Sequence, residues 1–123
     1  MISGGLEEVA SIDHIETISL FVAACVHDYE HPGVNNVFLV NIQDPIAVRH
    51  NDISVLESHH IASAFALMNA EEQNNWMHKY KSDDFKRIRK QMIDAVFATD
   101  MSKHFGELGQ FKSLIGTGDF KAN

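Results

Sequence analysis

The fold is decided first by residues 11–33, SIDHIETISLFVAACVHDYEHPG. Between Ile18 and Val26 this stretch is apolar almost all round, which predicts a buried helix. The helix must stop near Asp28, because His31-Pro32-Gly33 is a strong helix breaker. Over the whole stretch the apolar residues recur at helical spacing, at Ile12, Ile15, Ile18, Val22, Cys25 and Val26.

Further along the chain, the sequence also indicates where helices begin. A short helix is expected at about residues 34–40, and Asp44-Pro45 predicts another, with Asp44 as the N-cap and Pro45 as the first helical residue. Residues 54–57, SVLE, match a capping box that would open a helix reaching about Asn69.

Two more helices are predicted in the last third of the sequence. Asp83 or Asp84 opens the first, and a second is expected at about residues 102–114, before Gly116-Thr117-Gly118 ends the pattern. No alternation typical of a strand is present, and only nine residues are Gly or Pro, so the predicted fold class is all-α. One face of the first of these helices carries Phe85, Ile88, Met92 and Val96.

Length and charge limit the classes of function. A chain of 123 residues makes at most one domain, which we expect at residues 11–115, between a flexible N-terminal segment (1–10) and a tail (116–123). The net charge of −7 argues against a protein that binds nucleic-acid phosphates or an anionic membrane surface. No apolar run is long enough to span a bilayer. A single cysteine, Cys25, excludes an internal disulfide and fits a reducing, cytoplasmic location.

The pair His27-Asp28 is the strongest candidate for chemistry. Imidazole and carboxylate groups suit Zn²⁺, Mg²⁺ or Mn²⁺, and the end of a buried helix would hold them rigidly. The dipeptide taken alone is weak evidence and fits an exposed helix end, with Asp28 as a surface acid, better than a metal site. A zinc-protease reading of His27 to His31 fails because the two residues lie on either side of the predicted helix end.

A second acid–imidazole pair follows at Glu57 and His60, which share one face of their helix. Such a pair can orient water at a metal. Locally, Glu57 could instead complete the capping box, and His59 or His60 could be an ordinary interior histidine. Asp100 and His104 look like a solvated surface pair, and Cys25, inside the apolar run, looks like a packed thiol.

Three motifs in a fixed order resemble those of class I cyclic-nucleotide phosphodiesterases. They are HDYEHPGVNNVFLV at residues 27–40, NDISVLESHH at residues 51–60 and ATDMSKH at residues 98–104. That family belongs to the all-helical HD-type metal phosphohydrolases. The resemblance implies hydrolysis of 3′,5′-cyclic nucleotides to nucleoside 5′-monophosphates in signal transduction.

The resemblance also implies roles for individual residues. His27 would bind a tightly held metal, usually zinc, and Asp28 would contact both that metal and a second one, magnesium or manganese. His31 would help orient the water between the metals. Waters on the second metal would be held by Glu57, His60 and Thr99, and Met101 would line the nucleotide pocket.

Several parts of the family's site have no counterpart in these 123 residues. The HNxxHAxD motif with the general-acid histidine, a further metal-binding aspartate and the purine-binding glutamine are missing. We therefore expect a central fragment that binds metal weakly and is inactive alone. Residues 11–13 and 58 resemble the cAMP-specific subfamily, whereas residues 29–30 resemble a different one. The resemblance therefore favours cAMP over cGMP as substrate only slightly. A homodimer is possible for the parent protein.

Two other readings remain open. The chain could be a catalytically dead helical remnant that serves as a binding module. It could also be an HD-type enzyme for another phosphate ester, although the second and third motifs argue against that.

Overall fold

The computed structural model describes residue 5 and residues 11–116. The expected N-terminal segment and tail therefore lie, apart from Gly5 and Gly116, outside the described residues. Residues 11–116 contain helices and turns and no strand, which confirms the all-α class. The elements are α2 (His14–Val26), α3 (Asn36–Asn41), α4 (Pro45–Arg49), α5 (Val55–Ala70), the 3₁₀ turns η2 (Glu72–Asn74) and η3 (Trp76–Lys79), α6 (Ser82–Phe97) and α7 (Met101–Gly116).

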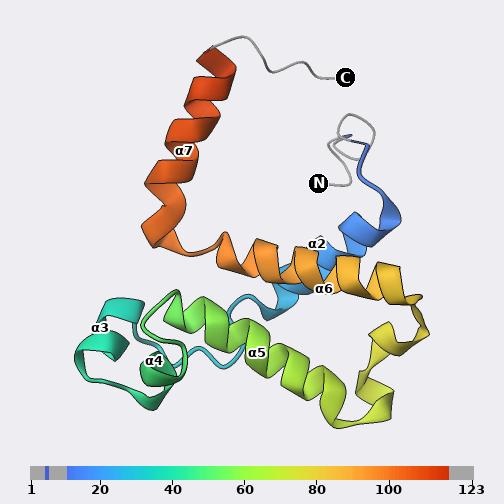
Figure 1. The fold of residues 1–123 in the computed structure, drawn as a ribbon, viewed down its shortest axis with the longest axis horizontal. Coiled ribbons are helices and arrows are strands. Elements are labelled where there is room, and N and C mark those ends of the chain that lie inside the picture. The colour runs from blue at the N-terminus through green and yellow to red at the C-terminus, as the bar shows by residue number, and fades with distance from the viewer. Residues whose placement is uncertain (1–4, 6–10, 117–123) are drawn as a thin grey trace.

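The main core lies between α2, α5 and α6, and Figure 1 shows α2 and α6 lying across one another above α5. The predicted face of α6 is confirmed, since Ile88, Met92 and Val96 are completely buried. Full burial of such side chains stabilises a fold by about 1.5–3 kcal/mol each. The remaining members of this core include Ile15, Ala23, Ile61, Ala64, Phe65, Met68 and Met77.

Helix α2 begins at His14 because Asp13 caps it. The Asp13 carboxylate accepts a hydrogen bond from the Glu16 N–H (2.9 Å), and the Glu16 carboxylate accepts one from the Asp13 N–H (3.0 Å). This reciprocal pair satisfies two donors at the helix start. Arg87 of α6 reaches both carboxylates and ties α2 to α6.

The expectation that α2 is buried all round is wrong. Only Ile15, Ser19 and Ala23 are buried, whereas Phe21 is 47% exposed. Cys25 is likewise exposed, so the prediction of a packed thiol is wrong. The physical reason is that α2 packs with one face on α6 and α5, and no other element of residues 11–116 covers the opposite face.

A small corner of two short helices leads from α2 to α5. Asn35 caps α3 by accepting from the Phe38 N–H (2.8 Å). Asp44 caps α4 with Pro45 as its first residue, as predicted. Leu39 and Ala47 pack with Val55 and Leu56 in a second buried cluster. The corner therefore fixes residues 35–36 beside the start of α5.

The predicted capping box at residues 54–57 is wrong, although the helix itself is confirmed. Ser54 adopts a left-handed conformation (φ 42°), and its side chain makes no hydrogen bond to the start of α5. Its hydroxyl instead donates to the Asp100 carboxylate at 2.6 Å, 46 residues away. A tertiary partner has replaced the local one.

Helix α7 runs away from the other helices, and it buries none of its side chains (Figure 1). Asp100, just before it, is 5% exposed and accepts hydrogen bonds from Ser54 and from the Ser102 N–H. The expectation of a solvated Asp100–His104 pair is therefore wrong for Asp100. None of the helices in the described part of the chain is long and apolar enough to cross a membrane.

Candidate metal centre

The three sequence motifs meet at one small cavity. It has a volume of about 310 Å³ and lies where the turn after α2 faces the first turns of α5 and the turn between α6 and α7. Every residue proposed to hold metals or their waters lies on its wall. The lining consists of His27, Asp28, His31, Leu56, Glu57, His60 and Thr99.

His60 is the buried anchor of this cavity, with 2% of its surface exposed. Its Nδ1 lies 2.7 Å from the Tyr29 carbonyl oxygen. A carbonyl can only accept, so Nδ1 carries the proton and the neutral ring keeps its lone pair on Nε2. Burial lowers the pKa of His60 and outweighs the Tyr29 hydrogen bond that raises it, which favours this neutral form.

His27 has the same tautomer for the same reason. Its Nδ1 donates to the Ala24 carbonyl at 2.8 Å, so the lone pair is on Nε2. That Nε2 lies 3.3 Å from Oδ2 of Asp28, and the His60 Nε2 lies 4.0 Å from Oδ1. The Asp28 carboxylate thus stands between two imidazole lone pairs, which is a suitable donor set for Zn²⁺.

His31 lies beside this set but differs from it. Its ring stacks on His60 with centroids 5.4 Å apart, and Asp28, His31 and His60 offer ligand atoms within 4.8 Å of one another. However, its Nδ1 accepts the Gly33 N–H at 2.9 Å, so the neutral ring has its proton on Nε2. His27 and His60 therefore present a ring lone pair toward the cavity, whereas His31 presents an N–H.

Glu57 and Thr99 form the other side of the cavity. Glu57 accepts a hydrogen bond from the side-chain amide of Asn36 (3.0 Å) rather than completing a capping box. The Thr99 hydroxyl donates to the Val96 carbonyl (2.7 Å), so its oxygen lone pairs remain available as acceptors. Both residues can accept hydrogen bonds from water.

Met101 lies outside the small cavity, next to it. It is 69% exposed and lines an adjoining hollow of about 770 Å³ that shares His31, Glu57 and Thr99 with the cavity. The volume of this hollow is in the range of sites that bind small ligands.

The other histidines of the motifs do not reach the cavity. His59 points to Glu30, with Nε2 and Oε2 3.2 Å apart, and His104 is exposed against Phe105. His59 is half-buried, near the interior position expected for it, and His104 has the solvated position on the helix surface that was expected.

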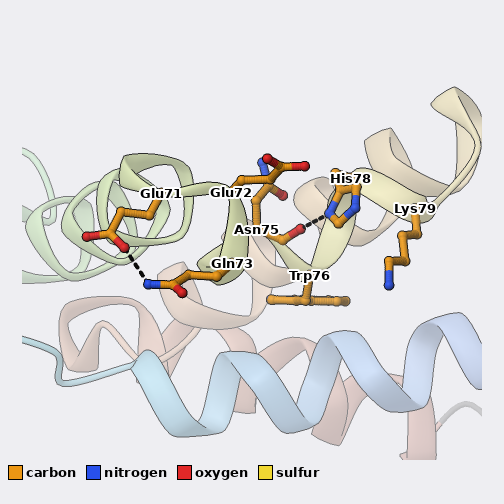
Figure 2. Close-up of a pocket in the computed structure, with 7 residues that line it drawn as sticks. All are labelled: Glu71, Glu72, Gln73, Asn75, Trp76, His78 and Lys79. Carbon is orange, nitrogen blue, oxygen red and sulfur yellow. Dashed lines mark hydrogen bonds between the residues drawn. The ribbon is translucent and has the colours of Figure 1, made fainter.

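A hollow larger than this cavity lies elsewhere on the described part of the chain. Figure 2 shows it at η2 and η3, where Gln73 donates to Glu71, the His78 ring contacts the Asn75 carbonyl, and the indole of Trp76 lies below them in this view. Its volume is about 820 Å³, but it contains no residue of the three motifs. Size alone therefore does not identify the site.

Sequence reasoning found six residues of the cavity wall and missed the residues behind it. Hydrogen bonds between distant segments lie behind this wall. Asn36 binds the Glu57 side chain and the Leu56 N–H, and Ser54 donates to Asp100. The Asn35-Asn36 pair was visible inside the first motif. Nothing local, however, indicates which of the two asparagines turns toward Glu57.

Comparison with known proteins places this geometry in a family. The family model described as 3′5′-cyclic nucleotide phosphodiesterase matches residues 1–123. A high affinity cAMP-specific and IBMX-insensitive 3′,5′-cyclic phosphodiesterase 8A from Mus musculus is 42% identical over 105 residues, which are 85% of this chain and 13% of that protein. A 3′,5′-cyclic-AMP phosphodiesterase 4 from Dictyostelium discoideum is 43% identical over 103 residues, 84% of this chain and 10% of that protein.

A solved structure agrees with these relatives. The phosphodiesterase domain of the RhoPDE fusion protein from the choanoflagellate Salpingoeca rosetta superposes with a TM-score of 0.85 at 34% identity, covering 92% of this chain and 36% of that domain. The chain thus spans about a tenth of the curated relatives it matches and about a third of the solved domain. The chain belongs to the 3′,5′-cyclic nucleotide phosphodiesterase family.

Proposed function

We propose that this chain is the metal-binding centre of a catalytic domain that hydrolyses 3′,5′-cyclic nucleotides, cAMP in preference to cGMP, to nucleoside 5′-monophosphates in signal transduction. The observation that carries the proposal is the convergence of all three motifs on one cavity. Relatives named as cAMP-specific and as cGMP-inhibited phosphodiesterases support the reaction class.

The donor atoms of the cavity fit the metals that this chemistry requires. His27 and Asp28 would hold Zn²⁺, because a neutral imidazole lone pair and a carboxylate lie 3.3 Å apart. Asp28 would also contact Mg²⁺ or Mn²⁺, which prefer oxygen ligands and retain waters. When bound, such cations polarise a phosphoryl oxygen and make water more acidic.

The protein groups around the donors would orient water and substrate. His60 Nε2, the Glu57 carboxylate and the Thr99 oxygen each offer an acceptor to a water hydrogen. His31 offers an N–H instead, so it can donate to an oxygen at the same place. Met101 would contact the nucleotide from the adjoining hollow.

Protonation of the leaving 3′ oxygen needs a general acid, and we assign none to this chain. We therefore propose that residues 1–123 alone do not hydrolyse cyclic nucleotides. Metal-dependent release of nucleoside monophosphate by the purified chain would contradict this part of the proposal.

The test is a chimera in which residues 11–115 replace the matching segment of the Salpingoeca rosetta phosphodiesterase domain. We expect hydrolysis of a cyclic nucleotide, and a loss of at least about 100-fold in kcat for Asp28→Asn because the carboxylate charge is removed. Asp83→Asn, the same change at an exposed site on α6, should retain the activity. A folded chimera that binds Zn²⁺ no better than its Asp28→Asn variant would overturn the proposal.

Nucleotide preference needs a different measurement, because a host domain would supply its own purine pocket. We would extend the transcript in both directions and assay the encoded protein. Faster hydrolysis of cAMP than of cGMP at equal low concentration supports the proposed preference, and the reverse ratio refutes it.

A further inference from the structure

The first turn of α5 is capped by a residue from another helix. The side-chain oxygen of Asn36, the first residue of α3, accepts a hydrogen bond from the Leu56 N–H at 2.8 Å. The side-chain nitrogen of the same residue donates to Oε2 of Glu57 at 3.0 Å. One carboxamide therefore holds both the backbone and the acidic side chain of this turn.

The amide can make both bonds because its oxygen accepts while its nitrogen donates. An aspartate could accept from Leu56 but could not donate to Glu57, and an alanine could do neither. The neighbouring Asn35 carries the same group but uses it to cap its own helix through the Phe38 N–H. The two adjacent asparagines thus have separate tasks.

Asn36 is itself held in place. It stands on α3, whose Leu39 is 2% exposed and packs with Val55 and Leu56 of α5. The segment that donates to Glu57 is therefore fixed to the helix that carries Glu57. Within residues 11–116 the structure shows no hydrogen bond to the second carboxylate oxygen of Glu57, which belongs to a side chain on the cavity wall.

We propose that Asn36 is a positioning residue for Glu57: it fixes one carboxylate oxygen so that the other is presented to water and metal in the cavity. This inference rests on the proposed function, because it gives Glu57 a task only if the cavity binds metal. Groups that orient the surroundings of a metal in this way affect its affinity by about 10- to 100-fold.

The contact itself is tested by a double-mutant cycle in the full 123-residue chain. Asn36→Ala, Glu57→Ala and the double variant are unfolded in urea, and the coupling between the two sites is extracted. The loss of the Leu56 bond is common to both Asn36 variants and cancels. We expect a coupling of at least about threefold in the unfolding equilibrium constant. A coupling indistinguishable from zero overturns the proposal.

The positioning role is tested by Mn²⁺ binding, followed by electron paramagnetic resonance. Asn36→Asp keeps an acceptor for Leu56 but replaces the donor to Glu57 by a repelling charge. We expect its Kd for Mn²⁺ to rise about tenfold. Asn35→Asp introduces the same charge one residue earlier and keeps a good N-cap, so its Kd should stay within about twofold of wild type. If Asn36→Asp does not fold, Asn36→Ala takes its place with the same criterion.

Asp28→Asn separates the two ways in which the test can fail. If this variant abolishes Mn²⁺ binding but Asn36→Asp and Asn35→Asp bind alike, the metal site stands and the positioning role is overturned. If wild type and Asp28→Asn bind Mn²⁺ equally weakly, the proposed function fails. The positioning role then fails with it, even when the double-mutant cycle shows coupling between Asn36 and Glu57.

Discussion

Helices α6 and α7 are both 16 residues long and both were predicted from sequence, yet their surroundings differ completely. Ile88, Met92 and Val96 of α6 are completely buried against α2 and α5. In α7 the apolar residues Phe105 and Phe111 are 81% and 52% exposed. Local sequence decides that both segments are helical, but packing partners decide which of them contributes to the stability of this chain.

The largest expected contrast comes from one substitution made in each region. Phe65 is 5% exposed at the contact between α5 and α6, where the Arg89 guanidinium lies 4.0 Å from its ring centroid. Phe65→Ala should lower the free energy of unfolding by about 3–5 kcal/mol, because it leaves a cavity in the core. Phe105→Ala in α7 should change it by no more than about 0.5 kcal/mol.

Urea unfolding followed by circular dichroism measures both variants. Equal losses would show that α7 is packed in solution, and the contrast between the two helices would then be wrong.

The sequence predicted the features of this structure that depend on neighbouring residues, and it missed those that depend on contacts with distant residues. The burial pattern of α6 and the Asp44-Pro45 start of α4 depend on residues within one turn of each other, so the pattern was sufficient. The prediction of a capping box at Ser54 failed because the hydroxyl donates to a buried carboxylate 46 residues later, Asp100, which local sequence does not indicate. Cys25 was misplaced because an apolar run does not tell which of its faces will be covered.

The candidate site shows the same limit. The motifs identified the residues whose types carry chemistry, such as His27, Asp28 and His60. They could not identify Asn36, because its hydrogen bonds depend on which backbone donor lies next to it in space. Candidate residues can be named from their chemical type, whereas the residues that contact them require coordinates.

The next effect concerns the link between the core and α7. Asp100 accepts from Ser54 and from the Ser102 N–H, and hydrogen bonds to a buried charge contribute about 1.5–3 kcal/mol. Asp100→Asn leaves one oxygen for two donors, so we expect a loss in this range at pH 7. Asp83→Asn, which removes the same charge at an exposed site, should have little effect.

This link should also depend on pH in a defined direction. Burial raises the pKa of Asp100, but the hydrogen bonds from Ser54 and Ser102 and the charge of Lys103 together lower it below the ordinary value of 3.8. The contribution is therefore complete above about pH 4 and is lost as the pH falls through the lowered value. Wild type should lose stability more steeply than Asp100→Asn below pH 4, and parallel acid titrations of the two proteins would contradict this.

The smallest effect is expected on the α2 side of the core. Arg87 of α6 contacts the Asp13 and Glu16 carboxylates, with Nη2 and Oε1 of Glu16 3.1 Å apart, but all three groups are partly exposed. Arg87→Gln should therefore destabilise the chain less than Asp100→Asn does, and the loss should shrink as salt rises from 0.1 to 1 M, because the screening length falls from about 10 to about 3 Å. Lys86→Gln removes the same charge from a neighbouring exposed pair within α6 and is the matched control. If only Arg87→Gln shows a loss that depends on salt, the ion pair contributes to holding α2 and α6 together. A loss unaffected by salt would instead assign the role of Arg87 to the packing of its aliphatic stem on α2.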